Sequence, residues 1–301
     1  MSERKDLEAI DEAALGDPSG TREMEGLGRG RRIAFRVFAI VVSLSLLVLM
    51  VFSLLEAVIM WLSWDTLMSF IDDLPGGDEI HRAHFNIVGI VSWALVTGVV
   101  VQLRKPERRT AAMLQAVGIV VAGMAFYGLS GTITEWLTED VAPVVFVLIL
   151  AWLHPRAREL VKMPRLEPRM AGLVALAAVP WLVFITNQAI LQWRNVAGDT
   201  HAEMEHWATA ALLGIVVLWC GLVGSSDHSG WRLPAWIAGL ASIDYGLHSL
   251  VFPEAASNAS TSWGVAAVIW GFTFLAAAIT RSRGAVVDDS AVEEGATVEP
   301  K

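Results

Sequence analysis

Apolar residues recur along this chain in long runs, and these runs predict its helices. The runs cover residues 35–61, 81–103, 111–130, 136–154, 171–193, 205–224, 233–252 and 262–280. About 20 apolar residues are enough for a helix to cross the hydrocarbon core of a bilayer. The runs lack the period-two alternation of porin-type strands. The pattern therefore predicts an all-α, polytopic membrane protein with eight transmembrane helices. The fourth is the weakest, since only 144–153 is strongly apolar, and it predicts a short or tilted helix.

Basic residues gather at alternate ends of the runs and predict the orientation. Lys and Arg cluster before the first run, between the second and third, between the fourth and fifth, and after the eighth, whereas the other connections are acidic or neutral. Cytoplasmic loops carry the excess of Lys and Arg. Both termini are therefore predicted to be cytoplasmic, in a multi-pass protein of the cell (plasma) membrane. Segments 1–32 and 284–301 are predicted to be disordered cytoplasmic tails, the second one acidic.

Three sequence matches in the same order predict an internal duplication. Residues 78–91 align without gaps on 203–216, 127–130 on 245–248, and 56–61 on 188–193. Such self-similarity indicates a repeated unit. We expect a first four-helix repeat over 33–158 and a second over 159–283. Because each unit has an even number of helices, both units share one orientation, and a pseudo-twofold axis along the membrane normal is expected.

Composition narrows the partners and the chemistry. The chain is 54% hydrophobic with a mean hydropathy of +0.53, which is too apolar for an ordinary soluble domain. Its single cysteine, Cys220, allows neither an intramolecular disulfide nor a thiolate metal site, and we interpret it as a small core residue. The basic residues form no stripe outside the membrane-flanking loops, so nucleic-acid binding is not expected. The expected partners are the lipid bilayer and respiratory-chain or other membrane proteins.

Histidines and acids at one predicted depth are the main candidates for a site. Polar groups inside a bilayer are costly, so they are functional hypotheses by default. An acid three positions before a histidine lies on the same helix face, where it can orient the imidazole or bind a metal with it. The cofactor-binding candidates are His81, His84, His206 and His248, and the metal-ligand candidates are His81, His206, His248, Asp78 and Glu203.

Other polar residues share this depth. Candidate catalytic or relay residues are Tyr127, Tyr245, Glu56 and Asp244. The alternative for the two acids is simple pairing with Arg82 or a histidine. We interpret His201 as a solvated or capping residue, and His154 and His228 as ordinary interfacial residues.

Two haem-linked families resemble parts of this chain. It resembles haem A synthase in helix count, topology, duplication and the run 78–82, Asp-Glu-Ile-His-Arg. It is similar to a helix of haem-copper oxidase subunit one over 83–86, with Asn86 in place of that helix's second histidine. These resemblances imply a haem or copper site with a redox or haem-handling role. Haem A synthase also has histidine ligands on its fourth and eighth helices. The outer parts of the fourth and eighth runs of this chain hold no histidine, so the resemblance implies that His84 or His248 acts as a substitute ligand.

Three other functions stay open. A zinc hydrolase would use three protein ligands around one open position, with His81, His206 and His248 as candidates. A proton-coupled or metal-ion transporter or channel fits the repeats and the polar groups, although the inner halves of the runs are almost wholly apolar. The third is a non-catalytic membrane assembly factor. His84 and His248 each occur in one repeat only, which favours one asymmetric site at the seam.

Overall fold

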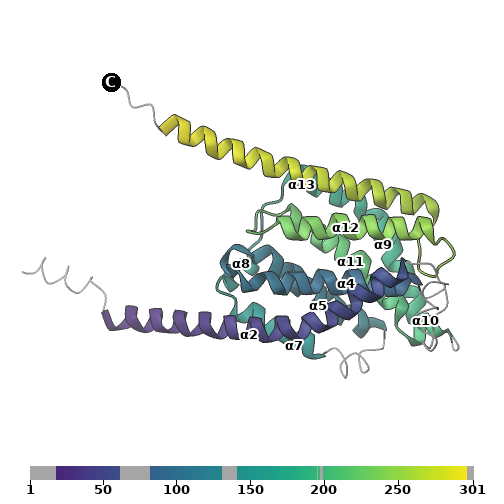
Figure 1. The fold of residues 1–301 in the computed structure, drawn as a ribbon, viewed down its shortest axis with the longest axis horizontal. Coiled ribbons are helices and arrows are strands. Elements are labelled where there is room, and N and C mark those ends of the chain that lie inside the picture. The colour runs from purple at the N-terminus through teal and green to yellow at the C-terminus, as the bar shows by residue number, and fades with distance from the viewer. Residues whose placement is uncertain (1–17, 62–81, 131–140, 195, 197–198, 297–301) are drawn as a thin grey trace, which may run out of the picture.

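The computed structural model describes residues 18–61, 82–130, 141–194, 196 and 199–296, and a helix lies at each of the eight predicted runs (Figure 1). The long helices are α2 (Pro18–Met60), α4 (Arg82–Val100), α5 (Thr110–Ser130), α7 (Val141–Leu153), α9 (Pro168–Arg194), α11 (His206–Ser225), α12 (Arg232–Val251) and α13 (Thr261–Ala296). The short ones are η2 (Val101–Leu103), η3 (Pro106–Arg108), α8 (Ala157–Leu160) and α10 (Thr200–Glu203). Over the described residues, one isolated bridge between Leu166 and Ser226 is the only extended pairing, so the all-α prediction is confirmed there.

Several helices have the length and composition of membrane spans. Within the described ranges, five are long and apolar enough to cross a membrane: Arg82–Leu103, Thr110–Gly128, Pro168–Arg194, His206–Ser225 and Thr261–Arg281. Helix α7 is apolar but only 13 residues long, as its sequence indicates. A backbone in lipid must satisfy its own hydrogen bonds, so apolar runs of this length form helices. These features agree with a helical membrane protein.

The long helices form two groups of four, called rings here because each helix packs on the next and the last packs on the first. Helix α2 packs on α4, α4 on α5, α5 on α7, and α7 on α2. Helix α9 packs on α11, α11 on α12, α12 on α13, and α13 on α9. Helices α4 and α5 lie against α11 and α12 between the rings, and α11 is the most buried of the five candidate spans.

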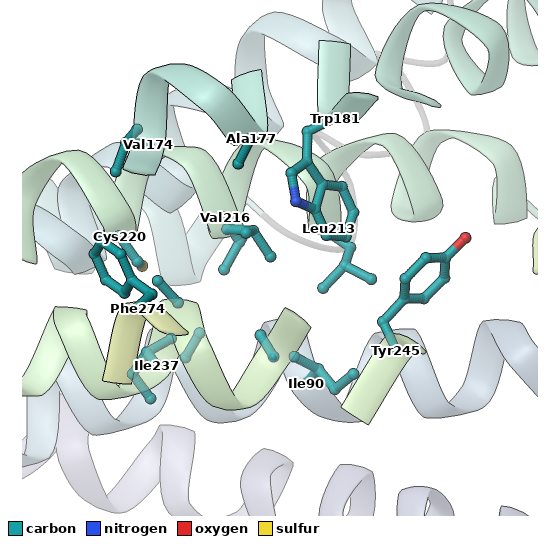
Figure 2. Packing of buried hydrophobic residues seen from close by; sticks show 14 of the residues in the cluster. Ile90, Val174, Ala177, Trp181, Leu213, Val216, Cys220, Ile237, Tyr245 and Phe274 are labelled. Atoms are coloured by element: carbon teal, nitrogen blue, oxygen red, sulfur yellow. The ribbon is translucent and has the colours of Figure 1, made fainter. Parts of the chain in front are cut away.

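The apolar core around α11 fills the inside of the second ring and extends to α4 and α5. Figure 2 shows Trp181 and Tyr245 toward one end of this core and Cys220 with Phe274 toward the other. Cys220 is fully buried, which confirms its interpretation as a core residue. Lipid is as apolar as such side chains, so close packing rather than removal from water holds membrane helices together.

Glycines let α12 and α13 approach closely. A Cβ on Gly246 would lie 2.6 Å from the carbonyl oxygen of Gly264, and a Cβ on Gly271 would lie 2.6 Å from that of Gly239. The two pairs are seven residues apart on each helix, so they lie on one face. Glycine is required at this contact because any side chain would separate the helices.

The bundle has two different ends. Helices α4 and α11 begin, and α9 and α12 end, at one end of the bundle, where α10 also lies (Figure 1). We call this the histidine end. At the opposite tail end lie α8 and the connections 101–109 and 154–167, with most of the basic residues. Arg281 is anchored there, since its guanidinium donates to the carbonyl oxygens of Gly224 (3.1 Å) and Ser226 (2.9 Å).

Candidate metal centre

Three histidines converge at the histidine end of the bundle. His84 lies in the first turn of α4, His201 in α10, and His206 is the first residue of α11. One ligand nitrogen from each lies within 4.8 Å of the other two. The rings of His84 and His206 are stacked, with centroids 4.3 Å apart, and the His201 centroid lies 5.1 Å from that of His84 and 5.8 Å from that of His206. His84 and His206 are buried and His201 is partly buried, so the cluster can hold one metal ion.

A left-handed residue brings His201 and His206 to the same place. Helix α10 ends at Glu203, α11 begins at His206, and Glu205 between them has φ 57°. Its carbonyl oxygen accepts both the backbone N–H and the hydroxyl of Thr209. A positive φ is uncommon outside glycine, and such strained residues cluster at functional sites. This break turns the chain so that both histidines face His84.

Asp199 orients His201. Its Oδ1 accepts the backbone N–H of His201 at 3.0 Å and lies 3.4 Å from the ring Nδ1. Its Oδ2 accepts the indole N–H of Trp207 at 3.1 Å, and that indole stacks on the His201 ring. Burial raises the pKa of Asp199, but the hydrogen bonds from Trp207 and His201 outweigh it and lower the pKa below its ordinary value. The carboxylate therefore holds the proton of His201 on Nδ1 and leaves the lone pair on Nε2, as carboxylates do behind zinc-bound histidines.

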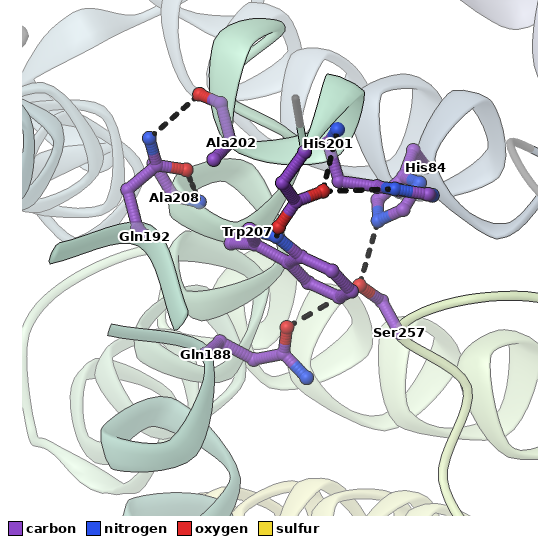
Figure 3. Close-up of polar contacts among 9 residues, drawn as sticks. His84, Gln188, Gln192, His201, Ala202, Trp207, Ala208 and Ser257 are labelled. Carbon is purple, nitrogen blue, oxygen red and sulfur yellow. Dashed lines mark hydrogen bonds and ion pairs between the residues drawn. The ribbon is translucent and has the colours of Figure 1, made fainter. Parts of the chain in front are cut away.

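Ser257 orients His84 in a similar way. Its hydroxyl lies 2.6 Å from Nε2 of His84 and donates to the amide oxygen of Gln188 at 3.3 Å (Figure 3). Since that hydroxyl gives its proton to Gln188, it accepts from Nε2–H of His84, and Nδ1 carries the lone pair for a metal. Ser257 is 7% exposed and has φ 66°, a second strained residue at the site. Its carbonyl oxygen accepts the hydroxyl of Tyr245 at 2.7 Å.

Gln192 joins α9 to the histidine-bearing segments. Its amide nitrogen donates to the carbonyl oxygen of Ala202 at 2.9 Å, and its amide oxygen accepts the backbone N–H of Ala208 at 3.2 Å (Figure 3). The side chain is buried. Gln192 thus fixes α10 and the start of α11 relative to each other.

The structure places the predicted histidines in different surroundings. His84 and His206 lie in the cluster, whereas the prediction for His201 is corrected, because it is a member rather than a solvated cap. His248 is buried outside it, with Nδ1 3.3 Å from Oδ1 of Asn258 and its ring against Trp61. His81 and Asp78 lie outside the described residues.

The predicted acids and tyrosines are also dispersed. Glu203 is exposed on α10, and the break at Glu205 removes the common helix face that it would share with His206. Asp244 accepts the amide N–H of Asn86 at 2.7 Å. The Tyr127 hydroxyl lies 3.2 Å from Oγ1 of Thr209, near the cluster.

Arg82, Glu56 and His154 were also interpreted from the sequence. Arg82, the proposed partner of the acids, lies over the ring of Phe252, 4.3 Å from its centroid. Glu56 belongs to α2, and its side chain is outside the described part. His154, just after α7, is fully buried, and this burial lowers its pKa to about 4.

The residues that support the three histidines through hydrogen bonds could hardly be identified from the sequence. Asp199 and Ser257 lie in connections, where single polar residues are common. Gln188 and Gln192 form an i,i+4 amide pair on the apolar α9, and this pair is the one signal that could have been read.

No protein family, no curated protein and no solved structure matches this chain. The side chains of the histidine cluster are therefore the basis for assigning a function.

Proposed function

We propose that the protein is an integral membrane metalloenzyme with zinc held by His84, His201 and His206. The convergence of three ligand nitrogens within 4.8 Å carries this proposal. Tetrahedral zinc with bonds of about 2.0–2.1 Å places its nitrogens about 3.3 Å apart, so the cluster must contract by about 1.5 Å at most. Three protein ligands leave a fourth position open, as in catalytic zinc sites.

The geometry favours a single ion over haem. Haem iron takes protein ligands from the two opposite faces of the macrocycle, so it can use two of three nitrogens that converge on one point. His84 and His206 are stacked with centroids 4.3 Å apart, which leaves no space for a macrocycle between them. Imidazoles also bind copper, but the softer thiolate and thioether ligands that select Cu(I) are not among the three.

The chain's own residues prepare this site for hydrolytic chemistry. When bound, zinc acts as a Lewis acid that polarises a carbonyl or phosphoryl oxygen and makes water more acidic. Asp199 and Ser257 fix which nitrogen of His201 and of His84 points to the ion. Gln188 and Gln192 hold Ser257 and the α10–α11 segment in place. Such supporting contacts preserve the ligand geometry during a reaction.

We also propose eight membrane crossings in two four-helix repeats, with the histidine end in the outer leaflet of the plasma membrane. The two rings of helix contacts follow the same order, which supports the duplication. In the proposed repeats, Tyr127 corresponds to Tyr245 and Thr209 corresponds to His84. Tyr127 contacts Thr209, and Tyr245 contacts Ser257, which in turn contacts His84. The basic residues at the tail end support a cytoplasmic position for that end.

A transport path has less support. The residues of α11 that are buried between His206 and Ser225 are all apolar or glycine. A proton or ion path would need polar groups along this length.

Metal analysis of detergent-purified protein tests the proposal. We expect one zinc per chain and no Soret band. The zinc should be lost in His84→Ala, His201→Ala and His206→Ala, and retained in the matched control His228→Ala, which lies outside the cluster. Zinc content unchanged by the three cluster substitutions would overturn the assignment, and a Soret band lost in the same variants would favour haem.

A further inference from the structure

A groove of about 1080 Å³ runs between α9, α12 and α13. This is slightly above the range of about 300–1,000 Å³ for small-molecule sites. Its walls are chiefly apolar and aromatic, with Trp181, Phe184 and Trp263 among them. Apart from Thr273 of α13, its polar side chains gather toward the histidine end of the bundle: Asn187, Gln188, Tyr245, Asn258 and Ser260.

The groove opens toward the surroundings of the bundle. Leu176, Val179 and Ile269 line it and are 70%, 67% and 60% exposed. They lie on α9 and α13, two of the helices long and apolar enough to cross a membrane. With these helices in a membrane, the molecules at this opening would be lipids.

The length of the groove suits one acyl chain. The indole N–H of Trp270 donates to the carbonyl oxygen of Leu173 at 2.8 Å. This bond joins α13 to α9 at the end of the groove that lies farther from the histidine end. From Leu173 to Gln188, α9 rises by about 22 Å at 1.5 Å per residue. Half of a hydrocarbon core measures about 15 Å, so the chain of a lipid in one leaflet fits lengthwise.

The polar end of the groove leads directly to the histidine cluster. Gln188 lines the groove and accepts the hydroxyl of Ser257, which contacts Nε2 of His84. Tyr245 also lines the groove and donates to the carbonyl oxygen of Ser257. Two hydrogen bonds thus separate the groove wall from a proposed metal ligand.

We propose that this groove binds the acyl chain of a membrane lipid and presents the lipid's polar group to the histidine site, so that lipids are the substrate class. The assignment of a substrate rests on the proposed metalloenzyme function. A groove that is apolar along its length and polar at one end is complementary to an amphiphile, which has one polar end. A packed helix of a second protein would instead meet polar groups at the end of its apolar face.

Photolabelling in reconstituted vesicles tests this binding site. The probe is a phosphatidylcholine with a diazirine in one acyl chain, and labelled residues are mapped by peptide mass spectrometry. The exposed apolar face of α2, with Ile33, Val37 and Val41, reports the labelling by ordinary surrounding lipid. We expect the groove residues of α9 and α13 to be labelled several-fold more than this face.

Two matched tryptophan substitutions on α13 separate the groove from the general surface. Ala266→Trp fills the groove and should reduce its labelling to the α2 level, whereas Ala276→Trp, exposed and outside the groove, should leave it unchanged. Groove labelling equal to that of α2, or unaffected by Ala266→Trp in protein that retains zinc, would overturn the inference. Zinc content of the same samples keeps the two proposals apart: zinc without excess label contradicts the lipid site alone, and excess label without zinc contradicts the metal site alone.

Discussion

Removing the Ser257 hydroxyl should weaken metal binding without removing a ligand. The hydroxyl lies 2.6 Å from Nε2 of His84 and 3.3 Å from the amide oxygen of Gln188, and the side chain is buried. In Ser257→Ala the His84 ring loses the contact that fixes its tautomer and orientation. Loss of such a supporting contact typically costs 10–100-fold in metal affinity, or about 1.4–2.7 kcal/mol.

The same substitution should reduce the stabilisation of the fold by zinc. At free zinc of 100 times the wild-type dissociation constant, binding adds about 2.7 kcal/mol to the free energy of unfolding. An affinity that is 10–100-fold weaker leaves about 1.4 to 0.4 kcal/mol at the same zinc concentration. The increase in melting temperature that zinc produces in detergent should shrink accordingly, and competition with a chelator gives the affinity directly.

Ser257→Gly provides the matched control for the backbone. At φ 66° an alanine pays a steric cost of about 1–2 kcal/mol that glycine does not. Without zinc, the glycine variant should therefore be more stable than the alanine variant by that amount. Both variants lack the hydroxyl and should lose the same zinc affinity. Wild-type affinity in Ser257→Ala, or affinity retained in Ser257→Gly alone, would refute the reasoning.

Three further predictions concern helix packing, pH dependence and zinc affinity. Gly246→Ala should lower the melting temperature by forcing α12 from α13, at a cost of about 1–3 kcal/mol, whereas Gly172→Ala on α9, with no atom within 4 Å of its Cβ, should not. Burial lowers the pKa of His154 to about 4, so between pH 6.5 and 4 the unfolded chain binds a proton at this residue more readily than the folded one. The free energy of unfolding should therefore fall by about 3 kcal/mol from pH 6.5 to pH 4. Thermal unfolding measured across this pH range should show a smaller fall for His154→Asn. Asp199→Asn should weaken zinc binding 10–100-fold, because it removes the negative charge beside the His201 ring. Titration with a zinc chelator measures this affinity. An unchanged affinity would show that Asp199 does not support His201 as a ligand.

The helices could be predicted because apolar length decides them. Each predicted run coincides with a helix, including the short α7, since in lipid a backbone has few alternatives to the helix. Two of the three clustered histidines, His84 and His206, could also be found from the cost of a polar residue at membrane depth.

The rest of the site depends on tertiary geometry. His201 lies in a four-residue helix outside the apolar runs, and it reaches the cluster because Glu205 adopts a left-handed conformation that its sequence does not signal. Ser257 is 173 residues from His84 along the chain. Depth alone also could not tell that His248 would face Asn258 and Trp61 rather than the other histidines.

X-ray absorption at the zinc edge of the purified protein tests the metal centre most directly. We predict a spectrum of three imidazole nitrogens at about 2.0–2.1 Å with one further light ligand. His201→Ala should abolish this spectrum, because the site loses one of its three nitrogens and with it the zinc. A zinc environment made only of oxygens, or one that is the same in wild type and His201→Ala, would contradict the three-histidine site.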